Sequence, residues 1–119
     1  MPDILEEHRF DLGSFADELT GATTDVGTTL LFENGRVRVW EVRLAPGMRC
    51  PFHAHTHPYF WTCVIAGTGR QRSGDGTLRV LRYAVGDTSF WEPAGAATLL
   101  HDLENVGDTE LRFVTVELR

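Results

Sequence analysis

The residues best suited to chemistry in this chain are histidines. His53 and His55 are two positions apart, and His101 follows far downstream with Asn105 four residues behind it. Alternate side chains of an extended strand project from the same face, so His53 and His55 are expected about 7 Å apart on one face. Neutral imidazole is the commonest metal-ligating side chain for zinc, iron, copper and nickel. The spacing therefore predicts a metal site assembled from two distant strands, with His101 as the third ligand.

The density of histidine in this region strengthens the prediction. A single histidine on a strand is more often a packed or surface residue than a ligand. The run from His53 to His57 contains three histidines in five residues, which packing alone does not explain. His57 is the alternative third ligand if His101 is out of reach, and it is also a candidate catalytic residue that moves a proton.

The composition excludes several classes of function. All 11 basic residues are arginine, so no lysine is available for a Schiff base or as a catalytic base. The formal net charge of −6 offers no basic field, and we expect neither a nucleic acid nor a membrane partner. The N-terminal residues lack the features of a secretory signal, so we expect a cytoplasmic protein. In that compartment Cys50 and Cys63 are expected to be free thiols.

The elements that position the histidines are predicted to be strands. Residues 1–27 are acidic and rich in small polar residues, and they predict an N-terminal arm with a short helix, where 14–17 resembles a capping box. Residues 28–119 alternate short apolar segments with glycine turns, which is typical of an all-β sandwich or barrel. A phase slip at Trp40 predicts a β-bulge there. The predicted strands are 28–32, 36–44, 49–57, 59–66, 70–73, 77–82, 88–92, 99–104 and 110–118.

The strand 59–66 is apolar on both faces, which is typical of a strand buried on both sides. Pro58 is a natural point for the strand phase to break. On the predicted phasing the cavity side carries Phe60, Thr62 and Val64. The opposite side then carries Tyr59, Trp61, Cys63 and Ile65. We expect that opposite side to pack in a homodimer or under the arm, with one thick core as the alternative. On the other phasing, Tyr59 is a candidate general acid or hydrogen-bond donor.

These residues resemble the cupins, small β-barrels of the double-stranded β-helix, or jelly-roll, type. The first motif of that family contains a glycine, His-x-His, a glutamate and a second glycine, and the second motif contains Gly, Pro-x-Gly, His and Asn. The positions that fit the first motif are Gly47, His53, His55 and Gly67. Those that fit the second are Gly86, 93–95, His101 and Asn105. The resemblance covers about residues 28 to 118.

Among the cupins, the chain looks most like small single-domain proteins related to the β-alanine degradation protein BauB. The segments that carry this similarity are HAHTHPY at 53–59 and NVGDT at 105–109. Two departures stand out. The position of the family's glutamate ligand is Phe60, or Tyr59 in the shorter spacing, and neither is a carboxylate. Five residues separate Gly95 from His101, where the family usually has two, which would displace the third ligand.

The missing carboxylate has a chemical meaning. Three neutral imidazoles leave a divalent ion with its full charge and several open positions, which suits Lewis-acid chemistry or oxygen activation. The resemblance implies a non-haem dioxygenase-type enzyme, with Fe(II) favoured over Zn, Ni, Mn or Cu, acting on a small carbonyl, enol or carboxylate compound. One alternative is a metal-dependent isomerase, cyclase or lyase in which Tyr59 or His57 moves a proton. Another is a non-catalytic cupin that binds a small ligand.

Overall fold

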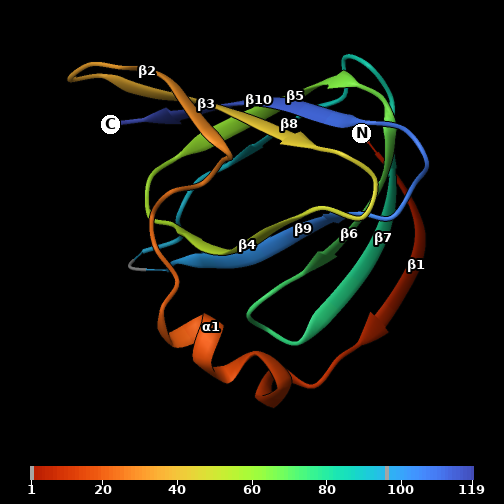
Figure 1. The fold of residues 1–119 in the computed structure, drawn as a ribbon. Helices are drawn as coiled ribbons and strands as arrows, with labels where there is room; N and C mark the ends of the chain where they lie inside the picture. The colour runs from red at the N-terminus through yellow and green to blue at the C-terminus, as the bar shows by residue number, and fades with distance from the viewer. Residues whose placement is uncertain (1, 96) are drawn as a thin grey trace.

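The computed structural model describes residues 2–95 and 97–119, which form two five-stranded antiparallel sheets facing each other (Figure 1). The strand order is β1-β7-β6-β9-β4 in sheet A and β2-β3-β10-β5-β8 in sheet B. The strands are β1 (Asp3–Arg9), β2 (Thr29–Glu33), β3 (Val37–Leu44), β4 (Arg49–His55), β5 (Tyr59–Ile65), β6 (Gly67–Arg72), β7 (Thr77–Tyr83), β8 (Thr88–Trp91), β9 (Leu99–Asn105) and β10 (Leu111–Leu118). A 3₁₀-helix, η1 (Leu12–Phe15), and one short α-helix, α1 (Ala16–Thr20), connect β1 to β2.

The strands confirm the all-β prediction. Each strand predicted from the sequence is present, and no end is shifted by more than three residues. The sequence analysis missed β1, which pairs with β7 at the edge of sheet A. All seven residues of β1 are exposed, so their polarity does not alternate as it does in a strand with one buried face. None of the helices that the structure describes is long and apolar enough to cross a membrane.

Two local predictions were wrong. The capping box is absent: the carboxylate of Asp11 accepts from the Gly13 amide and begins η1, and α1 starts without a side-chain cap. The predicted bulge is not at Trp40 in β3, whose register with β10 is unbroken. The register shift lies instead in the neighbouring β2, between Leu30 and Phe32. A central strand is held on both sides, so the extra residue is accommodated in the edge strand.

The predicted phasing of β5 was also wrong. Tyr59 and Cys63 are buried on the inner side of sheet B, whereas Val64 is 37% exposed on the outer side. Three residues separate the end of β4 from Tyr59, and β5 begins immediately after Pro58, so the strand phase is reset. A core cluster between the sheets contains residues from both of them: Val42, Leu44, Cys50, Cys63, Leu81, Tyr83, Leu111 and Phe113. Both cysteines are free, as predicted, and both are buried.

The N-terminal segment packs on the outer side of sheet A. Figure 1 shows α1 below β4 and β9. The Ala54 amide donates to the Thr23 carbonyl at 2.8 Å, which joins this segment to the backbone of β4. An aromatic cluster fills the space between them, with the Phe15 and Phe52 rings 5.4 Å apart. The strand that carries two of the histidines is thus held from outside as well as by its neighbour β9.

Candidate metal centre

The three predicted ligands come together on the inner face of sheet A. His53 and His55 lie on β4, and His101 lies on β9 directly opposite His53 in the antiparallel register. One nitrogen from each ring lies within 4.8 Å of the other two. The longer spacing before His101 does not displace it, because the pairing of β9 with β4 sets its position. His53 and His55 are only 5% and 1% exposed.

The hydrogen bonds of the rings leave nitrogens turned toward one another. Nδ1 of His53 lies 2.8 Å from the Pro51 carbonyl, to which it can donate, and Nδ1 of His101 contacts the side-chain amide of Gln71. Nε2 of His55 and Nε2 of His101 face each other at 2.9 Å. Two nitrogens that each lie about 2.1 Å from one ion, at nearly a right angle, are separated by about 3 Å. The arrangement therefore fits a shared ion.

Burial keeps the three rings in the form that binds metals. It lowers the pKa of His53 and of His101, and it lowers the pKa of His55 to about 2. The neighbouring imidazoles add to the effect at His55 and His101, because a second positive charge would repel the first. Nδ1 of His55 is buried and has no hydrogen-bond partner among the described residues. Neutral imidazoles with free lone pairs are the donor set expected at a metal centre.

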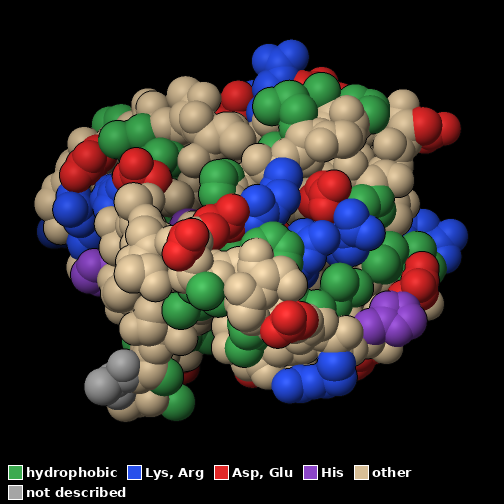
Figure 2. All heavy atoms as spheres, turned by 60° about the horizontal axis from the view of Figure 1, so that its bottom comes forward, with side chains coloured by type: hydrophobic (Ala, Val, Ile, Leu, Met, Phe, Trp, Pro, Cys, Tyr) green, Lys and Arg blue, Asp and Glu red, His purple; other side chains and the backbone are tan. Residues whose placement is uncertain are grey.

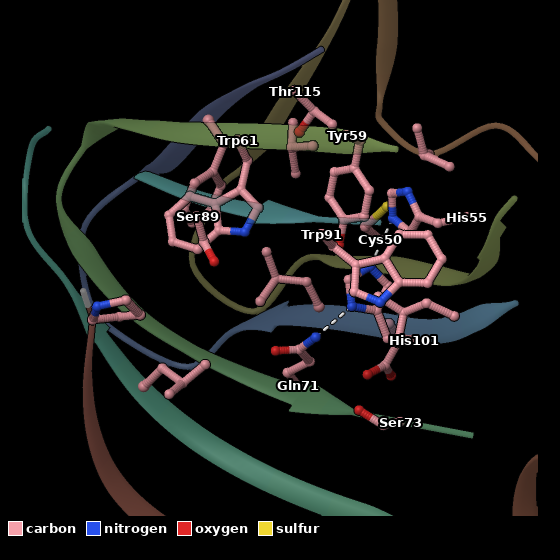
Figure 3. Close-up of a pocket in the computed structure, with 18 of the residues that line it drawn as sticks. Cys50, His55, Tyr59, Trp61, Gln71, Ser73, Ser89, Trp91, His101 and Thr115 are labelled. Atoms are coloured by element: carbon pink, nitrogen blue, oxygen red, sulfur yellow. Dashed lines mark hydrogen bonds between the residues drawn. The ribbon is translucent and has the colours of Figure 1, made fainter. Parts of the chain in front are cut away.

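Two aromatic side chains flank His55. The Tyr59 ring stacks on the imidazole with the centroids 3.7 Å apart and the planes inclined by 11°. The Trp91 ring lies 6.5 Å from the imidazole and 5.8 Å from the Tyr59 ring (Figure 3). Burial raises the pKa of Tyr59, so its hydroxyl is protonated at neutral pH and can donate a hydrogen bond. Tyr59 thus occupies the cavity side, where the sequence analysis had placed Phe60.

The histidines line a cavity of about 390 Å³ between the sheets. Its walls are mainly aromatic and aliphatic, with contributions from Val26, Val42, Tyr59, Trp61, Leu81, Tyr83, Trp91, Leu99, Leu103 and Phe113. The uncharged polar side chains of the lining are Gln71, Ser73, Ser89 and Thr115. Arg79 is the only guanidinium among the described lining residues; its side chain is 48% exposed and lies 3.6 Å from a Glu7 carboxylate oxygen. The cavity thus has no buried fixed positive charge in the part of the chain described.

A buried ion cluster supports the histidine strands from the outer side of sheet A. The Asp102 side chain is fully buried and accepts from Arg49 Nε at 2.8 Å and from Arg72 Nη1 at 2.9 Å. It also accepts from the Arg72 backbone amide at 2.7 Å. Arg49 in turn binds the carboxylate of Glu18 in α1, and this pairing lowers the pKa of Glu18. The cluster therefore joins α1, β4, β6 and β9 directly behind the site.

His57 and Asn105 lie outside the cluster. His57 is exposed in the turn between β4 and β5 and is not among the described residues that line the cavity. Asn105 is fully buried and braces a turn: its amide donates to the carbonyls of Leu44 and Thr109, and its side-chain oxygen accepts from Gly107. The structure thus gives Asn105 the role of bracing this turn.

The sequence analysis did not identify Gln71, Trp91 or Asp102 as site residues. Gln71 lies between two arginines, a pattern typical of an exposed strand. Asp102 follows His101 and therefore points to the opposite face of β9, which was a usable signal. Its arginine partners, Arg49 and Arg72, come from distant parts of the chain and could not be identified from spacing.

No protein-family model matches the sequence, and the search of curated proteins gave no match. Solved structures do resemble the fold. A cupin domain from Bordetella pertussis Tohama I is 25% identical, with a TM-score of 0.66 over 76% of this chain and 90% of that one. A Klebsiella pneumoniae protein with a double-stranded β-helix domain is 21% identical, with a TM-score of 0.61 over 95% of this chain and 90% of that one.

A third similar structure, from Silicibacter pomeroyi, is described as a sugar phosphate isomerase from a cupin superfamily. It is 23% identical, with a TM-score of 0.51, and the match covers 71% of this chain and 52% of that one. Together with the strand topology, these similarities show that the chain has the cupin-type double-stranded β-helix fold. The closer similarity to BauB-like proteins stays a prediction.

Proposed function

We propose that His53, His55 and His101 bind one divalent metal ion, and that the cavity is the active site of a non-haem metal-dependent oxygenase. The observation that carries the proposal is a set of three neutral imidazoles without a carboxylate, two of them buried, beside an aromatic cavity. Fe(II) is the favoured ion, because imidazole ligands and open positions suit oxygen chemistry. When bound, the ion would supply Lewis acidity and positions for substrate and oxygen.

The side chains around the site would prepare it for this chemistry. Gln71 and the Pro51 carbonyl hold two of the imidazoles in fixed orientations, which is the usual role of groups behind metal ligands. The aromatic walls would lower the polarity around a bound substrate. The protonated hydroxyl of Tyr59 can donate a hydrogen bond to a substrate oxygen near His55.

The lining also favours a class of substrate. A phosphate group in a buried site is normally held by arginine, lysine or backbone amides at a helix N-terminus. Among the described residues that line the cavity, Arg79 is the only arginine or lysine, and its side chain is half exposed and lies near Glu7. We therefore expect an uncharged or singly charged carbonyl, enol or carboxylate compound with an apolar body, rather than a phosphorylated sugar.

Oxygen uptake tests the proposed reaction. Metal-free protein is loaded with Fe(II) or with Zn(II) and mixed with acetylacetone, as an uncharged enol probe, or with phenylpyruvate, as a singly charged 2-oxo acid. We expect one of these carbonyl probes to be consumed together with oxygen by the Fe(II) protein only, and glucose 6-phosphate to be left unchanged. If a probe is consumed at the same rate without oxygen, or with Zn(II) in place of Fe(II), the proposed oxygenase reaction is wrong.

The second candidate is a metal-dependent isomerase, cyclase or lyase. The observation in its favour is the close stacking of Tyr59 on His55, which places a protonated hydroxyl beside the site. Such an enzyme would work with Zn(II) and without oxygen. Replacing Tyr59 by Phe keeps the ring and removes only the hydroxyl, so a loss of about 10²-fold or more in kcat with unchanged metal content would support this reaction.

A further inference from the structure

Arg79 projects from the cavity face of sheet A. It alternates along β7 with Leu81 and Tyr83, and all three line the cavity, as expected for residues two apart in a strand. Its direct partner on β6 is Gln71, whose side-chain amide contacts Nδ1 of His101 (Figure 3). Directly paired residues point to the same side of a sheet. Arg79 therefore belongs to the wall that also carries the histidines.

The position of Arg79 relative to His101 follows from the strand register. Ser73, two residues after Gln71, pairs with His101. Arg79 is thus offset from His101 by two residues along the sheet and by two strands across it. Strands about 4.8 Å apart and a rise of about 3.4 Å per residue place the two backbones roughly 12 Å apart. A small molecule that reaches the histidine nitrogens with one end can therefore meet the long Arg79 side chain with the other.

The guanidinium of Arg79 has only a weak partner among the described residues. Its Nε lies 3.6 Å from a Glu7 carboxylate oxygen, and the two side chains are 48% and 55% exposed. Exposed ion pairs with this separation contribute little to stability, because water screens both charges. Arg79 is therefore not required to hold β1 on β7, and a better-placed anion can replace Glu7.

Other arginines of sheet A have a structural role. Arg70 donates to Glu104 at 2.8 Å, and Arg72 donates to Asp102 at 2.9 Å, on the outer side of the sheet. Figure 2 brings that side forward and shows arginine and acidic side chains intermingled there. These guanidinium groups are already bound by carboxylates of the fold. Arg79 differs from them because it faces the cavity and its hydrogen-bonding capacity is largely unused.

A half-exposed guanidinium at the rim of an apolar cavity suits a carboxylate. The N–H groups of arginine form a fork that matches the two oxygens of a carboxylate, and such charge-assisted hydrogen bonds are stronger than neutral ones. A doubly charged phosphate would be repelled by Glu7 and would find no second arginine or lysine among the described lining residues. The surroundings of Arg79 therefore favour an anion with a single charge.

We propose that Arg79 forms a carboxylate-binding subsite, and that the substrate carries its carboxylate at the end opposite to the carbonyl or enol group that faces the histidines. The inference rests on the proposed function for the chemistry at the histidine end. It narrows the substrate class to oxo or enol compounds with a remote carboxylate. A 2-oxo acid, in which the carboxylate adjoins the carbonyl, cannot reach both groups at once.

The acid 4,6-dioxoheptanoate and its methyl ester test the subsite. Both contain the diketone of acetylacetone, and only the acid carries a charge at the other end. Isothermal titration calorimetry gives the dissociation constant of each probe, with Zn(II) bound and without added metal. We expect the wild type to bind the acid about tenfold or more tightly than the ester, as for a charge-assisted pair.

Two substitutions of Arg79 and one control separate charge from structure. Arg79→Gln should abolish the preference for the acid and leave the affinity for the ester unchanged. Arg79→Lys keeps the charge without the fork, so it should retain part of the preference. The matched control is Arg82→Gln, also on β7. Arg82 is 62% exposed, lies 3.8 Å from Asp3 and is not among the described residues that line the cavity, so the preference should persist.

The ratio of the two dissociation constants distinguishes the subsite from the metal centre. A protein that holds no metal would bind both probes more weakly with the ratio unchanged, whereas an error in the subsite would remove the ratio and leave the metal content unchanged. Circular dichroism confirms that each variant is folded. An acid that binds the wild type no more tightly than the ester, or not at all, a preference that survives in Arg79→Gln, or an equal loss in Arg82→Gln would overturn the proposal.

Discussion

Removing the Asp102 carboxylate should destabilise the protein strongly. The group is fully buried and accepts three hydrogen bonds, from Arg49 Nε, Arg72 Nη1 and the Arg72 amide. Hydrogen bonds to charged groups contribute about 1.5–3 kcal/mol each, which sets an upper limit near 9 kcal/mol. Both arginines retain a second carboxylate partner, Glu18 or Glu104, so the loss is smaller.

For Asp102→Ala we expect the free energy of unfolding to fall by about 3–5 kcal/mol, as when one partner of a buried ion pair is removed. In a domain of this size that corresponds to a fall of roughly 10–20 °C in Tm. Urea titration and thermal melts followed by circular dichroism give both values. We expect a loss of stability rather than a gain, because each of the two guanidinium groups and the Arg72 backbone amide loses one hydrogen-bond acceptor.

The matched control is Asp3→Ala. Asp3 also pairs with an arginine, Arg82, but the closest approach is 3.8 Å and the Asp3 side chain is 76% exposed. Exposed pairs of this kind contribute about 0–1 kcal/mol. If Asp102→Ala costs no more than Asp3→Ala, the ion cluster does not hold α1, β6 and β9 together, and the explanation of how the histidine strands are supported is wrong.

Three further predictions follow from local geometry. Gly27→Ala should lower the free energy of unfolding by about 1–3 kcal/mol, because the new Cβ would lie 2.7 Å from Trp40 Cβ. The control Gly35→Ala, whose new Cβ has no atom within 4 Å, should be nearly neutral in the same urea titration. Gln71→Leu should weaken metal binding by about 10–100-fold in a chelator competition, since it removes a hydrogen bond to the third histidine, and unchanged affinity would refute its orienting role. Burial lowers the pKa of His55 from 6.5 to about 2, so the folded protein keeps this imidazole neutral while the unfolded chain binds a proton below pH 6.5. The free energy of unfolding of the metal-free protein should therefore be highest above pH 6.5 and should be about 2 kcal/mol lower at pH 5. A flat pH profile in urea titrations would contradict this.

The sequence predicted most of the fold, because each strand except β1 has a local signal. Turn residues, most often glycine, separate the apolar segments of the barrel, whereas β1, whose residues are all exposed, gave no such signal. The phase of a strand is determined less by its local sequence. The phase of β5 depends on how three residues after His55 cross between the sheets, and that geometry exchanged the roles of Phe60 and Tyr59.

The histidine cluster could be predicted in part for the same reason. His53 and His55 share a face by strand periodicity alone, whereas His101 joins them through the pairing of β9 with β4, although the spacing before His101 departs from the family motif. The residues that support the histidines could not be predicted from the sequence. Gln71 and the ion cluster around Asp102 bring together residues from β4, β6, β9 and α1, and nothing in their local sequence marks them as neighbours.

The most direct test of the central claim is the metal content of protein purified without a chelating tag, measured by elemental analysis after reconstitution with Fe(II). We expect about one ion per chain in the wild type and in His57→Ala, whose histidine is exposed outside the cluster, and near-complete loss in His53→Ala and His101→Ala. A wild type that binds no metal, or folded His53→Ala and His101→Ala variants that bind as much as the wild type, would contradict the metal centre.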